Sequence, residues 1–230
     1  MKTYAIAAAL LCLAPAAASS APAKKAASID WTQRTAQSTD GGFVMGNPKA
    51  KVTLVEYGSL TCPHCRHFAE TAMKPLTAGY IRTGKVRFEF RNYILNGYDL
   101  SASVIARCGG ASRFFPAAES FFATQDSWID RIRKTPKERL DAVDALPENK
   151  KLAAMADVAG FRSIAAAKGI SVASANKCLA DPAAAQRLAD MTDAAQERYG
   201  VNGTPTFFVN GTRVNGNDWA SVEAALKAAL

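Results

Sequence analysis

The feature that most constrains the fold is a long helical block, residues 100–199, which separates two regions of strand pattern. Ala-rich segments with helical periodicity follow one another through this block, and Gly and Pro residues separate them. One of these helices has a clear start, because Asp181 stands at its N-cap and Pro182 at its first helical position. Such a block between strands predicts a helical subdomain inserted into a sheet domain.

Before the block, the sequence predicts a strand, a helix and a second strand. Residues 52–57 form a β-branched apolar run, which is typical of a strand buried on both faces. A helix is predicted over residues 62–80, with Pro63 in its first turn and Pro75 at a kink or in its last turns. Apolar and charged side chains alternate over residues 86–91, which indicates a half-buried strand.

After the block, Asn210-Gly211 stands between the strand patterns of residues 206–209 and 212–214, and this dipeptide is a strong signal for a β-hairpin. A helix over residues 218–230 follows. Together with a short strand at residues 43–45, this order predicts an α/β fold. We expect a mixed sheet flanked by helices, in which a parallel strand–helix–strand unit joins an antiparallel hairpin, with an inserted all-helical subdomain.

The first 18 residues have the pattern of a cleaved secretory signal peptide. Lys2 supplies a positive charge, residues 5–13 form a short apolar run, and small side chains follow at residues 16–18. A retained membrane anchor is the alternative, but the run is shorter than the roughly 20 residues that a membrane helix needs. We therefore expect export to an oxidising compartment. The expected division is a signal peptide at 1–18, a flexible lead-in at 19–42, a sheet domain at 43–99 and 200–230, and the helical subdomain at 100–199.

The charge balance is basic, with 28 Lys and Arg residues against 20 Asp and Glu residues. The basic residues are scattered in short clusters rather than gathered in one stripe, as on a solvated surface. We therefore expect no nucleic-acid partner.

The chain has five cysteines, and removal of the signal peptide would take away Cys12. Cys108 and Cys178 both fall in the helical block, and two such cysteines in a secreted chain favour a disulfide over free thiols. A bond between them would close a loop of about 70 residues and stabilise the fold by roughly 4 kcal/mol. We assign this pair a structural role.

The other two cysteines lie in the sequence Cys62-Pro63-His64-Cys65, where a predicted strand ends and a helix begins. Backbone N–H groups and the positive end of the helix dipole would favour a thiolate at Cys62, and a protonated His64 would add to them. Cys65, one turn further on, should be more buried. A disulfide whose reduced form is stabilised in this way is an oxidant.

Two other interpretations of this motif are a short structural disulfide and a metal site. Zinc normally takes four ligands from Cys and His, and His64 and His67 are the two histidines of the sequence. A metal-binding protein that uses Cys62, Cys65 and His67 therefore stays open as the less favoured alternative. We expect no metal and no cofactor.

Two further positions are candidates for roles near this motif. Glu56 interrupts an apolar strand, where a carboxylate is costly unless it is paired, and it could exchange a proton with Cys65 through water. The alternative is a strand-end Glu that reaches solvent. Thr204-Pro205 precedes the hairpin, and by itself it indicates a trans proline that opens an edge strand.

Residues 52–65, which end in Cys-Pro-His-Cys, and the later Gly203-Thr-Pro-Thr-Phe-Phe-Val-Asn-Gly211 together resemble the DsbA-like thiol:disulfide oxidoreductases of the thioredoxin superfamily. The resemblance implies that Cys62 is the nucleophile and that Cys65 resolves the mixed disulfide. Pro63 and His64 would be the dipeptide that tunes the redox potential, and Glu56 would be the buried acid beneath the site.

The same resemblance implies that Pro205 is a cis proline facing the disulfide and that the Thr204 backbone pairs with substrate. The implied activity is a periplasmic oxidase, expected to be a monomer. It would pass disulfides to exported proteins with free cysteines and be reoxidised by a membrane partner of the DsbB type. Because Thr204 also occurs in isomerase-like relatives, a reductase or isomerase is the alternative, although residues 19–42 are too few for their dimerisation domain.

Overall fold

The computed structural model describes residues 1–4 and 29–230. Most of the expected signal peptide at 1–18, and the first part of the lead-in, lie outside the described residues. Within the described part, no helix is long and apolar enough to cross a membrane.

A six-stranded sheet lies at the centre of the fold, with the strand order β1-β2-β4-β3-β5-β6. The predicted mixed sheet is confirmed, because β3 pairs with β4 in parallel and with β5 in antiparallel orientation. The strands are β1 (Thr35–Gln37), β2 (Phe43–Gly46), β3 (Val52–Gly58), β4 (Val86–Asn92), β5 (Thr206–Val209) and β6 (Thr212–Arg213).

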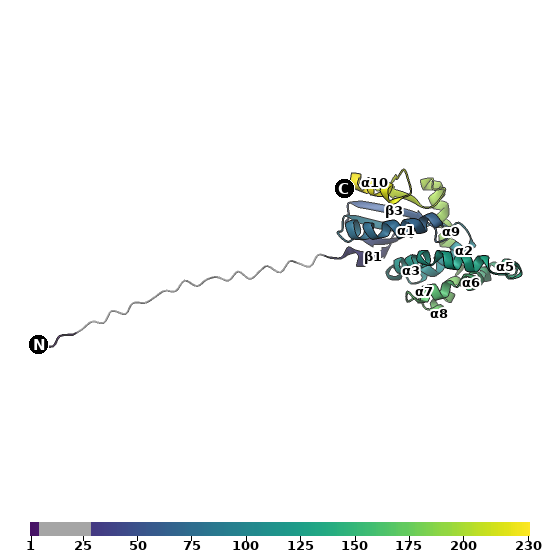
Figure 1. Cartoon of the computed structure of the whole chain (residues 1–230), viewed down its shortest axis with the longest axis horizontal. Coiled ribbons are helices and arrows are strands. Elements are labelled where there is room, and N and C mark those ends of the chain that lie inside the picture. The colour runs from purple at the N-terminus through teal and green to yellow at the C-terminus, as the bar shows by residue number, and fades with distance from the viewer. Residues whose placement is uncertain (5–28) are drawn as a thin grey trace.

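Helices cover both faces of this sheet, and most of them come from the middle of the chain (Figure 1). They are η1 (Trp31–Gln33), α1 (Pro63–Leu76), η2 (Thr77–Ile81), α2 (Gly97–Cys108), α3 (Ala111–Ala123), α4 (Gln125–Arg133), α5 (Lys137–Asp144), α6 (Glu148–Ala159), α7 (Phe161–Ala166), α8 (Val172–Leu179), α9 (Pro182–Tyr199) and α10 (Trp219–Ala229).

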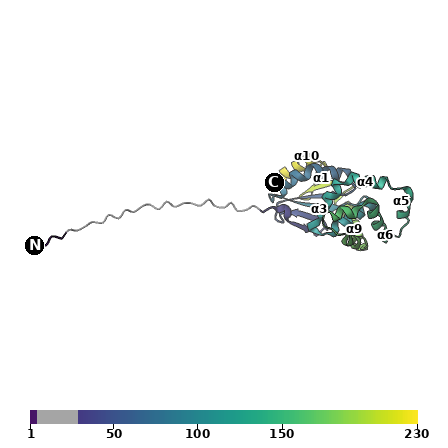
Figure 2. The same ribbon diagram turned by 60° about the horizontal axis from the view of Figure 1, so that its bottom comes forward.

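Alternate side chains of β3 enter two different apolar clusters. Leu54 belongs to the larger cluster, together with Phe68 of α1 and Leu226 of α10. Tyr57 belongs to the smaller one, together with Ala195 of α9. Helices α1 and α10 therefore pack on one face of the sheet and α9 on the other, as the second view also shows (Figure 2).

The predicted hairpin is present, and its geometry explains the dipeptide that forms it. Asn210 and Gly211 have φ of +49° and +82°, which is the left-handed region that Asn and Gly adopt most readily. The Asn210 side chain also accepts a hydrogen bond from the Thr53 backbone N–H, 2.8 Å away, and so ties the turn to β3.

The first helix has two parts. It is α-helical from Pro63 to Leu76 and continues as the π-helical segment η2 up to Ile81. Pro75 lies just before this change, and it has no N–H to donate to the preceding turn. The helix predicted over 62–80 is thus confirmed, with Pro75 in the last turn of its α-helical part.

The structure differs from the sequence-based expectation in the lead-in. Residues 35–37, expected to be flexible, form the edge strand β1 and pair with β2. A three-residue polar strand carries too short a pattern to be recognised.

The alternation in β4 was also misleading, because Glu89 is buried although it falls on the face expected to be polar. Arg91, two residues further along the same strand, donates to Glu89 over 2.8 Å, and Ser38 also donates to it. Ser38, in the turn between β1 and β2, covers the Glu89–Arg91 pair. Because Ser38 is 51 residues away from Glu89 in the chain, the local sequence pattern of β4 does not reveal this contact.

The expected boundaries of the helical insertion also differ from the structure. The boundary after residue 99 falls inside α2, which begins at Gly97. Helix α9, assigned to the insertion, packs on β4, and α3 packs on β1, β2 and α1. One continuous apolar core joins the sheet to the helical block.

A disulfide joins Cys108, the last residue of α2, to Cys178 in α8, with an S–S distance of 2.04 Å and a Cα–Cα distance of 6.0 Å. It closes a separation of 70 residues inside the helical block. Helices α2 and α8 also pack on each other, so the bond lies within an existing helix–helix contact.

Candidate active site

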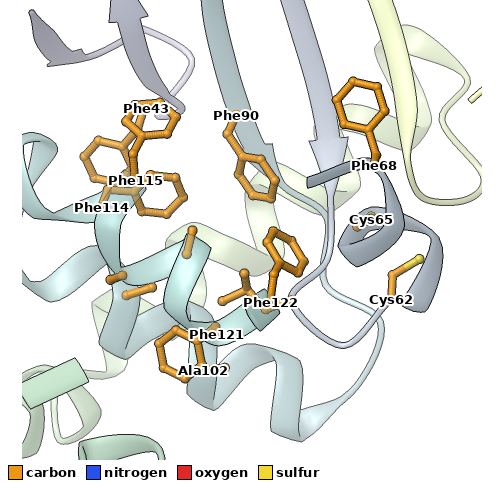
Figure 3. Packing of buried hydrophobic residues seen from close by; sticks show 14 of the residues in the cluster. Phe43, Cys62, Cys65, Phe68, Phe90, Ala102, Phe114, Phe115, Phe121 and Phe122 are labelled. Atoms are coloured by element: carbon orange, nitrogen blue, oxygen red, sulfur yellow. The ribbon is translucent and has the colours of Figure 1, made fainter. Parts of the chain in front are cut away.

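Cys62 stands at the N-cap of α1, after the loop that leaves β3 at Gly58. Its backbone is extended and its side chain makes no capping bond, while Pro63 occupies the first helical position, where a missing N–H leaves no gap. The thiol is therefore free to point away from the helix. Figure 3 shows Cys62 at this end and Cys65 one turn further on, near Phe68.

The segment before β5 faces the Cys62 thiol. The Thr204–Pro205 peptide bond is cis, and the Cys62 Sγ lies 3.2 Å from the Thr204 carbonyl oxygen, to which it can donate. Because β5 pairs with β3, residues 142 positions apart in the chain meet at one edge of the sheet. Cys62 keeps 6% of its surface exposed there, whereas Cys65 has none.

The pKa of Cys62 is lowered from 9.0 to about 5. The largest cause is a hydrogen bond from the Cys65 thiol, which stabilises the thiolate. The Thr204 side chain and the backbone N–H groups of Cys65 and His64 act in the same direction, and partial burial opposes them. The Thr204 Oγ1 is buried and, among the described residues, makes no hydrogen bond of regular geometry.

The pKa of Cys65 is raised well above that of a free thiol. Burial is the largest cause, and the hydrogen bond to Cys62 and the charges of Glu56 and Cys62 add to it. Two thiols one helical turn apart therefore differ in kind at neutral pH, one a thiolate and the other a protonated thiol.

Glu56 is 3% exposed, in the middle of β3. Burial raises its pKa from 4.5 to about 8, and the nearby charge of Cys62 adds to the effect. At neutral pH this side chain is a carboxylic acid that can give a proton. It lines a cavity of about 560 Å³ whose walls come mainly from α1, α3 and β4. The alternative of a solvent-exposed Glu at the strand end is wrong.

Two buried polar residues, one in α2 and one in α4, hold the loop before Cys62. The Asp99 carboxylate, in α2, accepts hydrogen bonds from the backbone N–H groups of Leu60 and Leu95, at 2.9 and 3.0 Å. The Gln125 side chain, in α4, donates to the carbonyl oxygens of Leu60 and Cys62, at 2.8 and 3.1 Å. Sequence analysis missed both residues, because neither lies in a motif and both act over long sequence distances.

Pro63, His64 and His67, in the first turns of α1, are exposed. His64 contributes to the lowered Cys62 pKa through its backbone N–H. In the described part of the chain, no group of three or more His, Cys, Asp or Glu side chains is placed to hold a metal ion. Cys62, Cys65 and His67 are thus not brought together as ligands.

A protein-family model described as thioredoxin matches residues 38–228, and therefore most of the chain. The chain belongs to the thioredoxin family. A crystal structure of a protein-disulfide isomerase from Novosphingobium aromaticivorans is similar, with 33% sequence identity and a TM-score of 0.75, over 80% of this chain and 95% of that one. The predicted thioredoxin-like fold is thereby confirmed.

A more distant solved structure agrees in fold, and a further relative is similar in sequence. Wolbachia pipientis alpha-DsbA1 has a TM-score of 0.65 at 22% identity, over 80% of this chain and 88% of that one. A Rickettsia bellii protein named "putative protein-disulfide oxidoreductase" is 29% identical over 83% of this chain. The chain spans 65% of the length of that relative.

Proposed function

We propose that this protein is a dithiol–disulfide oxidoreductase that passes disulfides to protein substrates through Cys62 and Cys65. The observation that carries the proposal is the contrast between the two thiols. Cys62, at the helix N-terminus and beside the cis Thr204–Pro205 bond, has a pKa of about 5, and Cys65 is buried and protonated. Thiol–disulfide exchange uses one good leaving thiolate and one protected thiol together.

In the proposed reaction, a substrate thiolate attacks Sγ of Cys62 in the oxidised protein. The Cys62–Cys65 bond breaks, a bond between Cys62 and the substrate sulfur forms, and Cys65 leaves as a thiolate. Cys65 then takes a proton, and Glu56 is the proposed donor because its carboxyl group is protonated at neutral pH.

A second substrate thiolate attacks the substrate sulfur of the mixed disulfide, and Cys62 leaves as a thiolate. Two substrate thiols have then lost two electrons and two protons and become a disulfide. The electrons stay on the cysteine pair. Glu56 has given its proton to Cys65 and takes one back from solvent, so of the two protons that the substrate releases one replaces that of Glu56 and the other stays in solvent. Substrate backbone pairing along Thr204 would position the attacking chain in the manner of an added strand.

The lowered pKa favours the oxidising direction. A thiolate with a pKa of about 5 instead of 9 stabilises the reduced form at pH 7 by about 2.7 kcal/mol, which makes the potential about 60 mV more oxidising. We further propose an extracytoplasmic location, exported proteins with free cysteines as substrates, a membrane reoxidase of the DsbB type and a monomeric state. These four points rest on the resemblance and on the amino-terminal pattern.

A second candidate function is disulfide isomerisation. Thr204 before the cis proline is the residue that favours it, and the similar Novosphingobium aromaticivorans structure carries the isomerase name. An isomerase works from the reduced form, and the same Cys62 thiolate would attack a wrong substrate disulfide.

The test is a redox and pKa measurement on the purified protein. We expect thiolate absorbance of Cys62 to titrate near pH 5, and equilibration with glutathione to give a potential well above that of a structural disulfide. The variant His64→Ala measures how much the histidine ring adds to the lowering of the Cys62 pKa by the backbone N–H groups. A Cys62 pKa near that of a free thiol would overturn the oxidase proposal.

Two substrate assays separate the two candidates. The oxidised protein should form disulfides in a reduced, unfolded test protein at a stoichiometric amount. The reduced protein should be slow to rearrange a test protein with scrambled disulfides. The opposite pattern would favour isomerisation.

A further inference from the structure

The cavity that Glu56 lines lies between α1 and α3, on the face of the sheet that carries Phe88 and Phe90. Its volume of about 560 Å³ falls within the range of roughly 300–1,000 Å³ for ligand sites. The lining residues of α1 lie within 69–77 and those of α3 within 114–123, and in both helices they recur every four positions. One stripe of each helix therefore faces the space.

The walls of this cavity are largely aromatic. Most of its lining residues are apolar, and five of them are phenylalanines from β4 and α3. These rings are buried and lie in contact with one another, with centroid distances from 5.4 to 6.4 Å (Figure 3). The small side chains of Ala69 and Ala118 leave room beside them. Such walls favour an aromatic ligand, because its ring can pack edge-to-face or offset on the others. The five are Phe88, Phe90, Phe114, Phe115 and Phe122.

Glu56 is the buried one among the polar residues of the lining. It is the register partner of Phe90 on the neighbouring strand, so both side chains project from the same face of the sheet. Its carboxyl group makes no hydrogen bond with any described residue, and its raised pKa comes from burial and from the charge of Cys62 alone. A protonated carboxyl group carries one O–H donor, and a buried donor without an acceptor is costly. An acceptor on a ligand would remove that cost.

The charged residues of the lining stand at its rim. Glu70 and Lys74 on α1 and Glu119 on α3 are exposed. They carry both signs and are screened by solvent, so they select no ion strongly. The apolar depth of the cavity also disfavours a charged group. A ligand that fits should therefore be uncharged.

We propose that this cavity binds an uncharged aromatic compound with a carbonyl group. The ring would pack against the phenylalanines of α3 and β4, and the carbonyl oxygen would accept a hydrogen bond from the carboxyl group of Glu56. Binding at this site does not use the exchange reaction of Cys62 and Cys65. The proposal can therefore fail while the proposed function holds, and the reverse.

Benzophenone is the probe, because it is an uncharged aromatic ketone that bonds covalently to nearby side chains, methionine among them, under near-ultraviolet light. Met45 and Met73 line the cavity, whereas Met155 and Met191 are outside its lining. We expect saturable labelling of the full chain at Met45 or Met73, located by peptide mass spectrometry, and little at the other two. The measurement is made at pH 6, where Glu56 is protonated.

Titrations followed by backbone amide NMR test the role of the carbonyl group. Diphenylmethane has a similar shape and no carbonyl oxygen, so it should bind about tenfold more weakly than benzophenone. Glu56→Leu removes the donor and should weaken benzophenone binding by about tenfold, with little effect on diphenylmethane. Glu56→Gln keeps an N–H donor and should stay within about threefold of the wild type. Neither variant breaks a hydrogen bond between described residues, so both should fold.

A second pair of variants tests the location. Ala69→Leu adds bulk inside the cavity and should weaken the binding of both compounds by about tenfold or more. Ala224→Leu is the matched control, because Ala224 is exposed on α10 and outside the lining. It should change either affinity by less than about twofold.

Four results would overturn the proposal. Labelling spread evenly over Met45, Met73, Met155 and Met191 would show contact without a site, and so would a titration that does not saturate. Equal affinities for benzophenone and diphenylmethane would leave the carbonyl group unrecognised. Unchanged benzophenone binding by Glu56→Leu would show that Glu56 is not the donor.

Discussion

Replacing Glu56 by Gln tests whether this buried acid is protonated in the folded protein. Burial raises its pKa from 4.5 to about 8, so at intermediate pH the folded state holds a proton that the unfolded state has released. Wild-type stability should therefore fall by about 1.4 kcal/mol per pH unit between those two values. Gln does not titrate, so this loss is absent from Glu56→Gln.

The expected magnitude follows from the two pKa values. Relative to Glu56→Gln, the wild type should lose about 2.5 kcal/mol of unfolding free energy between pH 5 and pH 7. At pH 7 the variant is the more stable protein. In thiol exchange it should be slower, by roughly 10²-fold, because Cys65 loses its proposed proton donor.

The assay is urea unfolding at pH 5 and pH 7, followed by circular dichroism. The protein is reduced until Cys62 and Cys65 react with a thiol reagent while Cys108–Cys178 stays bonded. Glu70→Gln is the matched control, because Glu70 lies on α1 with 53% of its side chain exposed. Its stability difference from the wild type should be nearly the same at both pH values. An equally flat difference for Glu56→Gln would mean that Glu56 is ionised in the fold, and the proton-transfer argument would fail.

Three further changes test the surroundings of the cysteine pair. Thr204→Val should raise the pKa of Cys62, and each pKa unit gained would make the glutathione-equilibrium potential about 30 mV more reducing; an unchanged potential would contradict a role for the hydroxyl. Changing Cys108 and Cys178 together to Ala should cost roughly 4 kcal/mol in urea unfolding and spare thiol exchange; lost exchange at full stability would contradict the structural role. Gln125→Ala should cost roughly 1–3 kcal/mol, because it strands two buried carbonyl groups, whereas unchanged stability would show that water replaces the amide.

The parts of the fold that sequence analysis predicted correctly are those that local chemistry decides. Asn210-Gly211 forms its hairpin because two successive residues must take positive φ. Asp181 caps α9 through a hydrogen bond from the Ala183 N–H, two residues away. In both cases the deciding atoms lie within a few residues, so the pattern carries the whole cause.

The parts that were missed depend on contacts between distant segments. Asp99 is an ordinary polar residue of a helix until the fold brings it against the Leu60 N–H, and Gln125 becomes significant only where α4 meets the same loop. Glu89 looks like the exposed half of an alternating strand until Arg91 and the β1–β2 turn enclose it. Each is polar and buried. Unlike Glu56, none of them interrupts an apolar run, so the sequence carries no signal for its burial, and its partner is chosen by topology.

The position of the cysteine pair could be predicted, but the origin of its chemistry could not. The motif indicated a thiolate held by the helix terminus and by the His64 ring, whereas in the structure the Cys65 thiol is the largest cause of the lowered Cys62 pKa. Burial keeps Cys65 protonated, and a protonated thiol can donate to its neighbour. The same desolvation keeps Glu56 protonated. Cys62 is partly exposed, whereas Cys65 and Glu56 are more deeply buried, and this difference in burial leaves one charged sulfur beside two protonated groups. A polar substitution that admits water behind Cys65 should therefore raise the pKa of Cys62, although the substituted residue makes no contact with Cys62.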